Sequence, residues 1–535
     1  MRNTHYRRGA AALSFGALMA TVPSVPAAHA DALPDVTNVG VAQLSRWLAG
    51  GKVTSAQLVR AYEARIRAYD DRGPRINAVI SVNAGALKEA ARLDAERRSG
   101  RVRGPLHGIP ILLKDNYDTA EMPTTNASMA LKGMRPADDA TQVARLRKAG
   151  AIVLGKTNLH EYAYGITTIS SLGGQTLNPY GLNRDPGGSS GGTGAGIAAS
   201  FAPIGMGTDT CGSIRIPSSH NALVGLRPTL GLSSRDGIIP MSQTQDTGGP
   251  LGTSVRDVAL VLDATAGYDR KDPITKASIG KTPRSYLSGL SSHALQGRRI
   301  GVMNGLFLAK GDQKETSRLV RAAAGDLKAQ GATLVNLGAQ TELLTTMDAA
   351  SVVASEFERD LNAYLASPGL RFPKGLASQT APYDKVTLAD IVATGKVTPS
   401  VLKLIKPLVG TTPKPGTKRQ AAYRTALANR AKLRAGLTDL YRAKHLDAIV
   451  YPTITQQAQP IGQDPAKDPN RNCQLSAHTG FPALSLPAGF TPQGMPVGME
   501  LLGTPFSEPK LLGMGYDFEQ ATRHRRPPAS APPLE

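Results

Sequence analysis

The segment at residues 185–196, Asp-Pro-Gly-Gly-Ser-Ser-Gly-Gly-Thr-Gly-Ala-Gly, restricts the fold more than any other part of the chain. Glycine gives the backbone access to turns and close approaches that other residues rarely adopt. A helix-like run at 191–200 and a strand-like run at 201–207 follow directly. This arrangement indicates a tight turn at a helix start that holds two hydroxyls, those of Ser189 and Ser190.

Three other interpretations of this segment compete. A flexible linker is disfavoured because strand-like and helix-like runs flank it closely. A phosphate-binding P-loop needs a lysine after the last glycine, and the chain has none there. A dinucleotide fingerprint needs G-x-G-x-x-G after a strand, and Gly-Thr-Gly-Ala-Gly-Ile at 192–197 does not match it. The sequence therefore favours a turn that presents hydroxyl groups.

Strand-like and helix-like patterns alternate along the chain. Thr54 or Ser55 caps a helix in which Leu58, Tyr62 and Ile66 recur at helical spacing. Such alternation predicts an α/β fold, with a large mixed, mostly parallel β-sheet covered by helices on both faces. The strand-like runs lie at 76–83, 109–114, 151–155, 201–207, 299–304, 333–336, 448–451, 483–486 and 497–502, and further helix-like runs at 86–99, 141–149 and 313–330.

Residues from about 340 to 440 break this alternation, because they contain mainly helical pieces such as 355–366 and 418–435. We expect a single domain over 31–535 that carries this segment as a helical insertion. The last residues, 527–535, are expected to form a frayed tail.

Residues 1–30 have the pattern of a secretory signal peptide. Arg2, Arg7 and Arg8 precede an apolar stretch at 10–22, and Ala-His-Ala at 28–30 predicts cleavage after Ala30. The stretch is too short for a membrane span. Paired arginines also occur in twin-arginine signals, but the flanking residues favour the Sec type. The mature chain is expected to be secreted, extracellular or periplasmic, with no membrane association.

The formal net charge is +21, and it becomes +18 when the three arginines of the signal are removed. The basic residues are scattered, aromatics make up 5%, and no nucleic-acid-binding module is present, so no nucleic-acid partner is expected. Two cysteines remain, Cys211 and Cys473. An oxidising compartment favours a disulfide between them, two buried thiols are the alternative, and their spacing fits no zinc motif.

A second Gly-Ser pair lies 24 residues after Ser189, in Gly-Thr-Asp-Thr-Cys-Gly-Ser-Ile-Arg-Ile-Pro-Ser at 207–218. Small residues before Ser213 allow consecutive backbone N–H groups to turn toward one point, which suits the binding of an oxyanion.

The block at 187–229, which ends in Ala-Leu-Val-Gly-Leu-Arg-Pro-Thr, resembles the signature of the amidase signature family. Further segments resemble the same family in the same order, so the resemblance covers roughly 42–270 and 440–520. They are His-Gly-Ile-Pro-Ile-Leu-Leu-Lys-Asp-Asn at 107–116, Leu-Gly-Lys-Thr-Asn-Leu-His-Glu at 154–161, Asn-Pro-Tyr at 178–180, Thr-Gly-Phe-Pro-Ala at 479–483 and Pro-Val-Gly at 496–498.

The resemblance implies an amidase signature fold and a Ser-Ser-Lys triad. Lys114 corresponds to the base, Ser189 to the bridging serine and Ser213 to the nucleophile, and the peptide bond between Gly188 and Ser189 is expected to be cis. Burial lowers the pKa of a lysine and lets it accept a proton, so Lys114 would draw one through Ser189 from Ser213.

An acyl-enzyme on Ser213 would form and then be hydrolysed, with no metal or organic cofactor. The oxyanion would be held by the backbone N–H groups of Thr210, Cys211, Gly212 and Ser213. Other polar residues near these motifs are expected to hold the loops of the site by hydrogen bonds; they are Ser190, Asp209 and Arg215.

The expected substrate is a small-molecule or peptide amide. Glu-Phe-Glu-Arg-Asp-Leu-Asn-Ala-Tyr-Leu at 356–365 resembles the peptide amidase branch, which favours C-terminal peptide amides. Two alternatives stay open: an aryl acylamidase or other small acyl-amide or ester hydrolase, and a catalytically silent binding protein on the same fold. Export argues against the subunit that supplies ammonia for transamidation of tRNA. No feature of the sequence indicates an oligomeric state.

Overall fold

A computed structural model describes residues 1, 33–373, 376, 386–463 and 471–535. The chain divides into two units, Met1–Leu33 and Pro34–Glu535, and every element below belongs to the second. Apart from Met1, the predicted signal peptide lies outside the described residues. Within the described ranges, no helix is both long and apolar enough to cross a bilayer.

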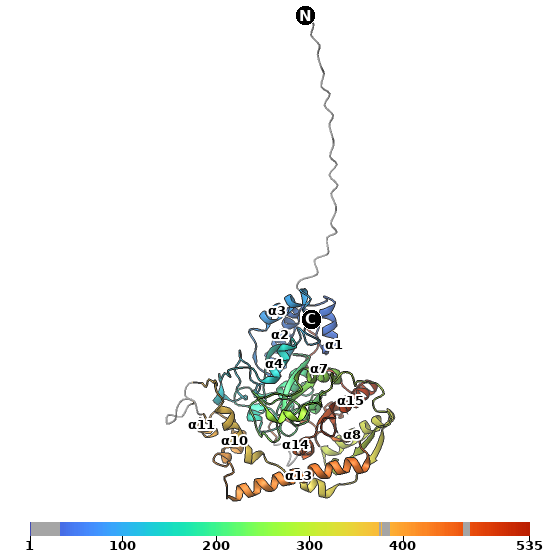
Figure 1. Ribbon diagram of the computed structural model, residues 1–535. Coiled ribbons are helices and arrows are strands. Elements are labelled where there is room, and N and C mark those ends of the chain that lie inside the picture. Colours follow the sequence, from blue (N-terminus) through green and yellow to red (C-terminus); the bar gives the residue numbers. More distant parts are fainter. Residues whose placement is uncertain (2–32, 374–375, 377–385, 464–470) are drawn as a thin grey trace. The chain divides into compact units, whose positions relative to one another are not determined.

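An eleven-stranded sheet runs through the second unit (Figure 1). A separate two-stranded ribbon consists of β4 (Ile169–Ser170) and β5 (Gly174–Gln175). The order across the large sheet is β1 (Val79–Val82), β3 (Ile152–Thr157), β2 (Pro110–Lys114), β6 (Ile204–Asp209), β8 (Thr247–Gly252), β7 (Val224–Arg227), β12 (Ala483–Phe490), β13 (Pro496–Leu502), β11 (Ala448–Pro452), β9 (Arg299–Val302) and β10 (Thr333–Asn336).

The predicted α/β class and the large mixed sheet are confirmed, with one correction to the strand directions. Parallel pairs join β3, β2 and β6 at one side and β11, β9 and β10 at the other, which makes four of the ten pairs. The other six pairs are antiparallel, so the sheet is not mostly parallel. Strand β8 enters between β6 and β7 in the opposite direction, and β12 and β13 form a hairpin, which needs no crossover helix.

A helix whose capping residue can be recognised in the sequence begins close to the predicted position. Thr54 caps its helix with a capping box to Gln57, as the Thr54 or Ser55 prediction requires. Between β10 and β11 the described residues contain helices and no strand, with one isolated bridge from Arg371 to Arg135. The helices are α1 (Val41–Ala49), α2 (Ser55–Arg65), α3 (Ala86–Arg98), α4 (Thr141–Lys148), α5 (Gly191–Ala198), α6 (Arg215–His220), α7 (Val255–Thr265), α8 (Asp312–Ala329), α9 (Thr341–Asp348), α10 (Val353–Leu365), α11 (Leu388–Ala393), α12 (Pro399–Ile405), α13 (Lys418–Lys444), α14 (Gln474–Thr479) and α15 (Glu508–Thr522).

Helices cover both faces of the sheet, as predicted. Successive side chains of a strand point to opposite faces. In β11, Ile449 and Tyr451 pack with residues of α9, α13 and α14, whereas Ala448 and Val450 pack with residues of α7, α8 and α15. Figure 1 shows α13 beside α14 and α15 beside α8.

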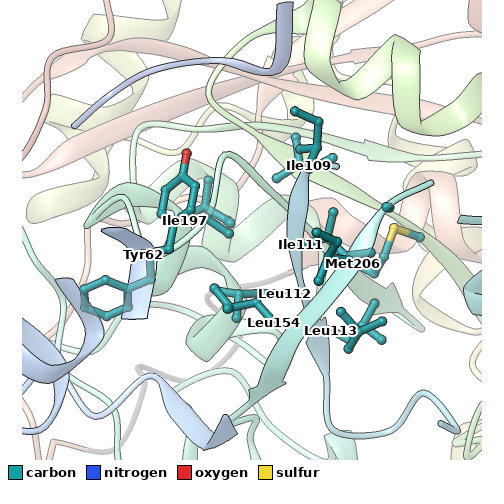
Figure 2. Packing of buried hydrophobic residues seen from close by; sticks show 14 of the residues in the cluster. Tyr62, Ile109, Ile111, Leu112, Leu113, Leu154, Ile197 and Met206 are labelled. Atoms are coloured by element: carbon teal, nitrogen blue, oxygen red, sulfur yellow. The ribbon is translucent and has the colours of Figure 1, made fainter. Parts of the chain in front are cut away.

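A third apolar cluster surrounds β2. Ile111, Leu112 and Leu113 are buried there against Met206 of β6 and Ile197 of α5 (Figure 2). Tight packing of these side chains fixes the path of β2, and therefore the position of the lysine at its end.

The C-terminal tail is ordered by a buried arginine, which corrects the prediction of a frayed end. The guanidinium of Arg65 donates to the carbonyl oxygens of Ala531 (2.8 Å) and Pro532 (2.9 Å), and Ala531 is 3% exposed. A buried guanidinium needs acceptors for its N–H groups, and the tail supplies them.

Candidate active site

The side chain of Lys114, the last residue of β2, is fully buried. Its Nζ donates to Ser189 Oγ at 2.7 Å and to Thr208 Oγ1 at 2.7 Å. Thr208 belongs to β6, the parallel neighbour of β2, while Ser189 stands just before α5. The sheet and the glycine-rich turn thus bring the predicted base and the predicted bridging serine into contact.

Burial lowers the pKa of Lys114 from 10.5 to about 7, and the carboxylates of Asp209 and Asp246 offset only part of this effect. A lysine with this pKa is uncharged in a large fraction of molecules at neutral pH. It can then accept a proton from a hydroxyl in hydrogen-bond contact.

The glycine-rich turn lies beside Ser213. The peptide bond between Gly188 and Ser189 is cis, as the resemblance implied. The amide of Ser190 donates to the Ser213 carbonyl at 3.2 Å, and the Ser190 hydroxyl donates to the Thr208 carbonyl at 3.2 Å. Ser213 is 5% exposed, and its hydroxyl makes no hydrogen bond within the described residues. All three predicted triad residues therefore belong to one small region.

Residues 210–213 follow β6 and end at Ser213. We call them the nucleophile loop after the role predicted for Ser213. The Gly212 amide donates to Asp209 Oδ1 at 2.7 Å, so it is not available to an oxyanion and the prediction of four donors is corrected. The Asp209 carboxylate closes the turn and captures this N–H. The amides of Thr210, Cys211 and Ser213 remain as candidate donors.

Gly212 has the conformation that only glycine adopts readily. Its φ is +85°, and an added Cβ would approach side-chain atoms of Ile216 and Cys473 to 2.6 and 2.9 Å. A larger residue at this position would therefore displace the nucleophile loop.

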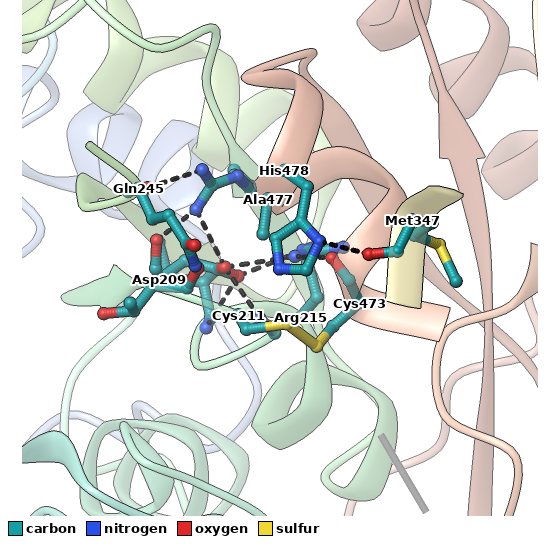
Figure 3. Close-up of a disulfide and its surroundings, with 12 residues drawn as sticks. Asp209, Cys211, Arg215, Gln245, Met347, Cys473, Ala477 and His478 are labelled. Atoms are coloured by element: carbon teal, nitrogen blue, oxygen red, sulfur yellow. Dashed lines mark hydrogen bonds and ion pairs between the residues drawn. A yellow bond between two sulfur atoms is a disulfide. The ribbon is translucent and has the colours of Figure 1, made fainter. Parts of the chain in front are cut away.

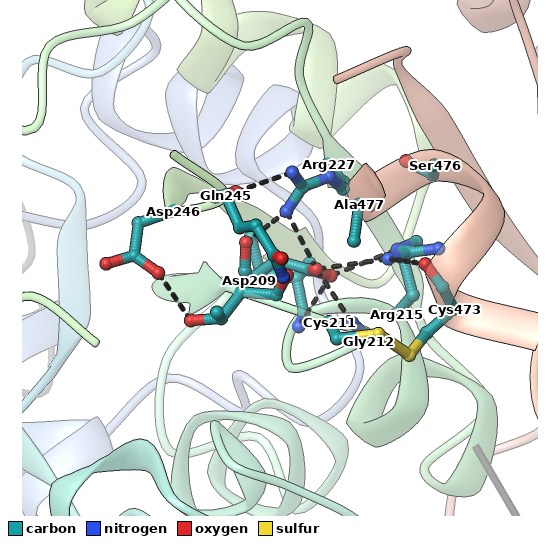
Figure 4. A network of polar contacts seen from close by, with 12 residues as sticks. Asp209, Cys211, Gly212, Arg215, Arg227, Gln245, Asp246, Cys473, Ser476 and Ala477 are labelled. Carbon is teal, nitrogen blue, oxygen red and sulfur yellow. Dashed lines mark hydrogen bonds and ion pairs between the residues drawn. A yellow bond between two sulfur atoms is a disulfide. The ribbon is translucent and has the colours of Figure 1, made fainter. Parts of the chain in front are cut away.

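Asp209 is the centre of a buried ionic network (Figure 4). Its carboxylate contacts Arg215 Nε at 3.0 Å and Arg227 Nη1 at 3.0 Å, and Arg215 Nη1 contacts Glu500 Oε1 at 2.6 Å. Burial by itself would raise the pKa of Asp209, but the two guanidinium groups hold it well below its usual range. These contacts are of the loop-holding kind expected for Asp209 and Arg215.

Cys211 and Cys473 form a disulfide, so the question that the sequence left open is answered in favour of the bridge (Figure 3). It joins positions 262 residues apart in the chain. Cys473 directly precedes α14, so the bridge ties the nucleophile loop to a C-terminal segment.

Sequence reasoning missed Thr208, Asn116 and Asp246. Asn116 Nδ2 donates to Thr208 Oγ1 at 3.0 Å, and Asp246 accepts from the Thr210 hydroxyl at 2.5 Å. All three line a cavity beside the nucleophile loop. Asn116 stands in the Lys-Asp-Asn motif, and Thr208 is a polar residue in a buried strand; either could have signalled a role. Among the described residues, no group of three or more His, Cys, Asp or Glu side chains could hold a metal ion.

Comparison with known proteins identifies the class. The Amidase family model matches residues 57–512. The structure resembles that of the native peptide amidase from Stenotrophomonas maltophilia, with a TM-score of 0.80 and 40% identity, covering 92% of this chain and 98% of that one. An amidase family protein from Bacillus anthracis is similar at a TM-score of 0.78 and 32% identity, covering 92% of each chain.

Relatives with another name are also similar in sequence. A glutamyl-tRNA(Gln) amidotransferase subunit of Moorella thermoacetica is 37% identical over 506 residues, which are 91% of this chain and 97% of the relative. This chain belongs to the amidase signature family, and it is an enzyme that acts on the C–N bonds of amides.

Proposed function

We propose that this chain is an exported amidase that hydrolyses the C-terminal carboxamide of peptides through an acyl-enzyme on Ser213. The observation that carries the proposal is the contact between a buried Lys114, with its pKa lowered to about 7, and the hydroxyl of Ser189. The next residue, Ser190, donates its amide to the Ser213 carbonyl.

In this mechanism Lys114 Nζ accepts a proton from Ser189 Oγ, which takes one from Ser213 Oγ. Ser213 then attacks the amide carbonyl carbon, and the amides of the nucleophile loop other than Gly212 donate to the oxyanion. The proton returns through Ser189 to the leaving nitrogen, which departs as ammonia. Water, activated along the same path, releases the carboxylic acid and regenerates Ser213.

The preference for peptide amides has two supports. The peptide amidase of Stenotrophomonas maltophilia is 40% identical over most of this chain. The segment at 356–365 that resembles its branch lies in α10, where Glu356 accepts hydrogen bonds from the amide (3.2 Å) and hydroxyl (2.5 Å) of Thr244. Thr244 follows Gln243, which lines a small cavity of about 10 Å³ beside the nucleophile loop, so α10 braces the segment next to that loop.

Export rests on the charged start, apolar stretch and Ala-His-Ala site at residues 1–30. A disulfide is also typical of proteins in oxidising compartments. The competing function is that of a glutamyl-tRNA(Gln) amidotransferase component, which the names of other relatives suggest. A protein that leaves the cytosol would not meet the partner chains or the tRNA of that reaction.

The test is a panel of amides offered to the purified mature chain and to Ser213→Ala. Ammonia release from peptide amides, absent in Ser213→Ala, is the expected result. Turnover of anilides alone would identify an aryl acylamidase, and release from free glutamine alone would favour the amidotransferase function. A chain that hydrolyses none of these and resists a phosphonate serine probe would be a silent binding protein.

A further inference from the structure

The nucleophile loop is held by hydrogen bonds at three of its four residues. The Thr210 carbonyl accepts from the Gln245 side chain at 3.1 Å, and the Gly212 amide donates to Asp209 at 2.7 Å. The Ser213 carbonyl accepts from an amide of the glycine-rich turn at 3.2 Å. Within the described residues, the backbone of Cys211 makes no hydrogen bond. Its link to the surroundings is the disulfide.

The other end of the bridge is firmly placed. Cys473 is 1% exposed, and its carbonyl accepts from Arg215 Nη2 at 3.2 Å (Figure 3). Arg215 also contacts Asp209, which binds the Gly212 amide. The disulfide and the ionic network therefore connect the same two segments of the chain, and the disulfide does so at the residue that the network does not reach.

We infer that the Cys211–Cys473 disulfide positions the nucleophile loop for hydrolysis, so that the activity requires an oxidising environment. The inference rests on the proposed function, because it concerns the amides that receive the oxyanion. With the bridge closed, the Cys211 amide is held in one orientation. With the bridge open, the peptide unit that carries the Cys211 amide keeps one hydrogen bond, from Gln245 to the Thr210 carbonyl, and no hydrogen bond to Cys211 itself. A donor that must reorganise stabilises the oxyanion less.

Opening the bridge needs a reductant, for which a small dithiol such as dithiothreitol serves. One thiolate of the reagent attacks a sulfur of the bridge and releases the other as a thiolate. The second thiol of the reagent then closes its own ring disulfide. Two electrons and two protons pass to the protein, leaving free thiols at Cys211 and Cys473. The sequence contains only these two cysteines, so a reductant acts on no other pair.

The experiment measures how fast a fluorophosphonate probe labels Ser213 in the oxidised, reduced and reoxidised enzyme. The control is the double variant Cys211→Ser, Cys473→Ser, with and without dithiothreitol. Values of kcat and KM for a peptide amide and the near-ultraviolet circular dichroism are recorded in parallel. Reduction should lower the labelling rate constant and kcat by about tenfold or more, with little change in KM. Reoxidation should restore both, and the double variant should be slow and insensitive to dithiothreitol.

Two results would overturn the inference. An unchanged labelling rate after reduction would show that the nucleophile loop keeps its arrangement without the bridge. Loss of the near-ultraviolet signal together with activity, in both the reduced enzyme and the double variant, would assign the bridge to the stability of the whole fold. If the oxidised enzyme labels but hydrolyses no peptide amide, the proposed function fails, while the labelling rates still decide the inference.

Discussion

Two buried lysines occupy adjacent parallel strands, Lys114 at the end of β2 and Lys156 in β3, one residue before the register partner of Lys114. Neither side chain is exposed to solvent. Lys114 Nζ donates to two hydroxyl groups, whereas Lys156 Nζ forms an ion pair with Asp115 at 3.1 Å. Burial is therefore common to the two lysines, and their polar partners distinguish them. No carboxylate of the described residues forms an ion pair with Lys114, so desolvation dominates its pKa.

The replacement Lys114→Met should have the largest effect on activity. It removes the proposed proton acceptor while keeping a long, apolar side chain, so kcat/KM should fall by about 10²- to 10⁴-fold. Circular dichroism should show an intact fold, since no buried charge loses its partner. Activity within a few-fold of the native value would mean that another group serves as the base.

The matched replacement Lys156→Met should act on stability instead. It leaves the Asp115 carboxylate buried without its cation, so the free energy of unfolding should fall by about 3–5 kcal/mol in urea titrations. Turnover per folded molecule should change far less than in Lys114→Met. If Lys156→Met lost as much kcat as Lys114→Met at unchanged stability, the two lysines would not differ in function as proposed.

The dependence of activity on pH should separate the lysines further. In the proposed mechanism the neutral form of Lys114 is the active one, and its pKa is about 7. The value of kcat/KM should therefore fall tenfold for each pH unit below about 7 and level off above it. Lys156→Met should retain the same midpoint. A profile that is flat from pH 5 to 8, measured on one peptide amide, would contradict the assignment.

The smallest expected effect is that of Thr208→Val, which removes one of the two hydroxyl acceptors of Lys114. One neutral hydrogen bond corresponds to a change of a few-fold to about tenfold in kcat/KM. The loss of an acceptor also disfavours the ammonium form, so the midpoint of the pH profile should move below that of the native enzyme. A midpoint at higher pH would show that Thr208 does not stabilise the charged lysine.

Local features of the fold could be predicted from the sequence because they depend on interactions between neighbouring residues. The cap at Thr54, the limits of β10 and the turn before α5 depend on neighbouring residues. The antiparallel pairing of β8 with β6 and β7 could not be predicted, because strand pairing depends on contacts between residues distant in sequence. The ordered tail was missed for the same reason, since its anchor, Arg65, stands over 460 residues earlier.

The site shows the same division. Motif resemblance pointed to Lys114, Ser189 and Ser213, but neither motif nor spacing indicated that Thr208 would face Lys114, because that contact depends on the register between β2 and β6. The capture of the Gly212 amide by Asp209 likewise depends on the path of the loop, which residue types alone do not determine.

A direct titration of Lys114 tests the central claim. The enzyme is labelled with ¹³C at lysine Cε, and the Lys114 resonance is identified by its absence from Lys114→Met. A titration midpoint near pH 7 is the predicted result. A midpoint near the ordinary lysine value of about 10.4 would mean that Lys114 is a charged group at neutral pH, and the proton path from Ser213 would have no acceptor.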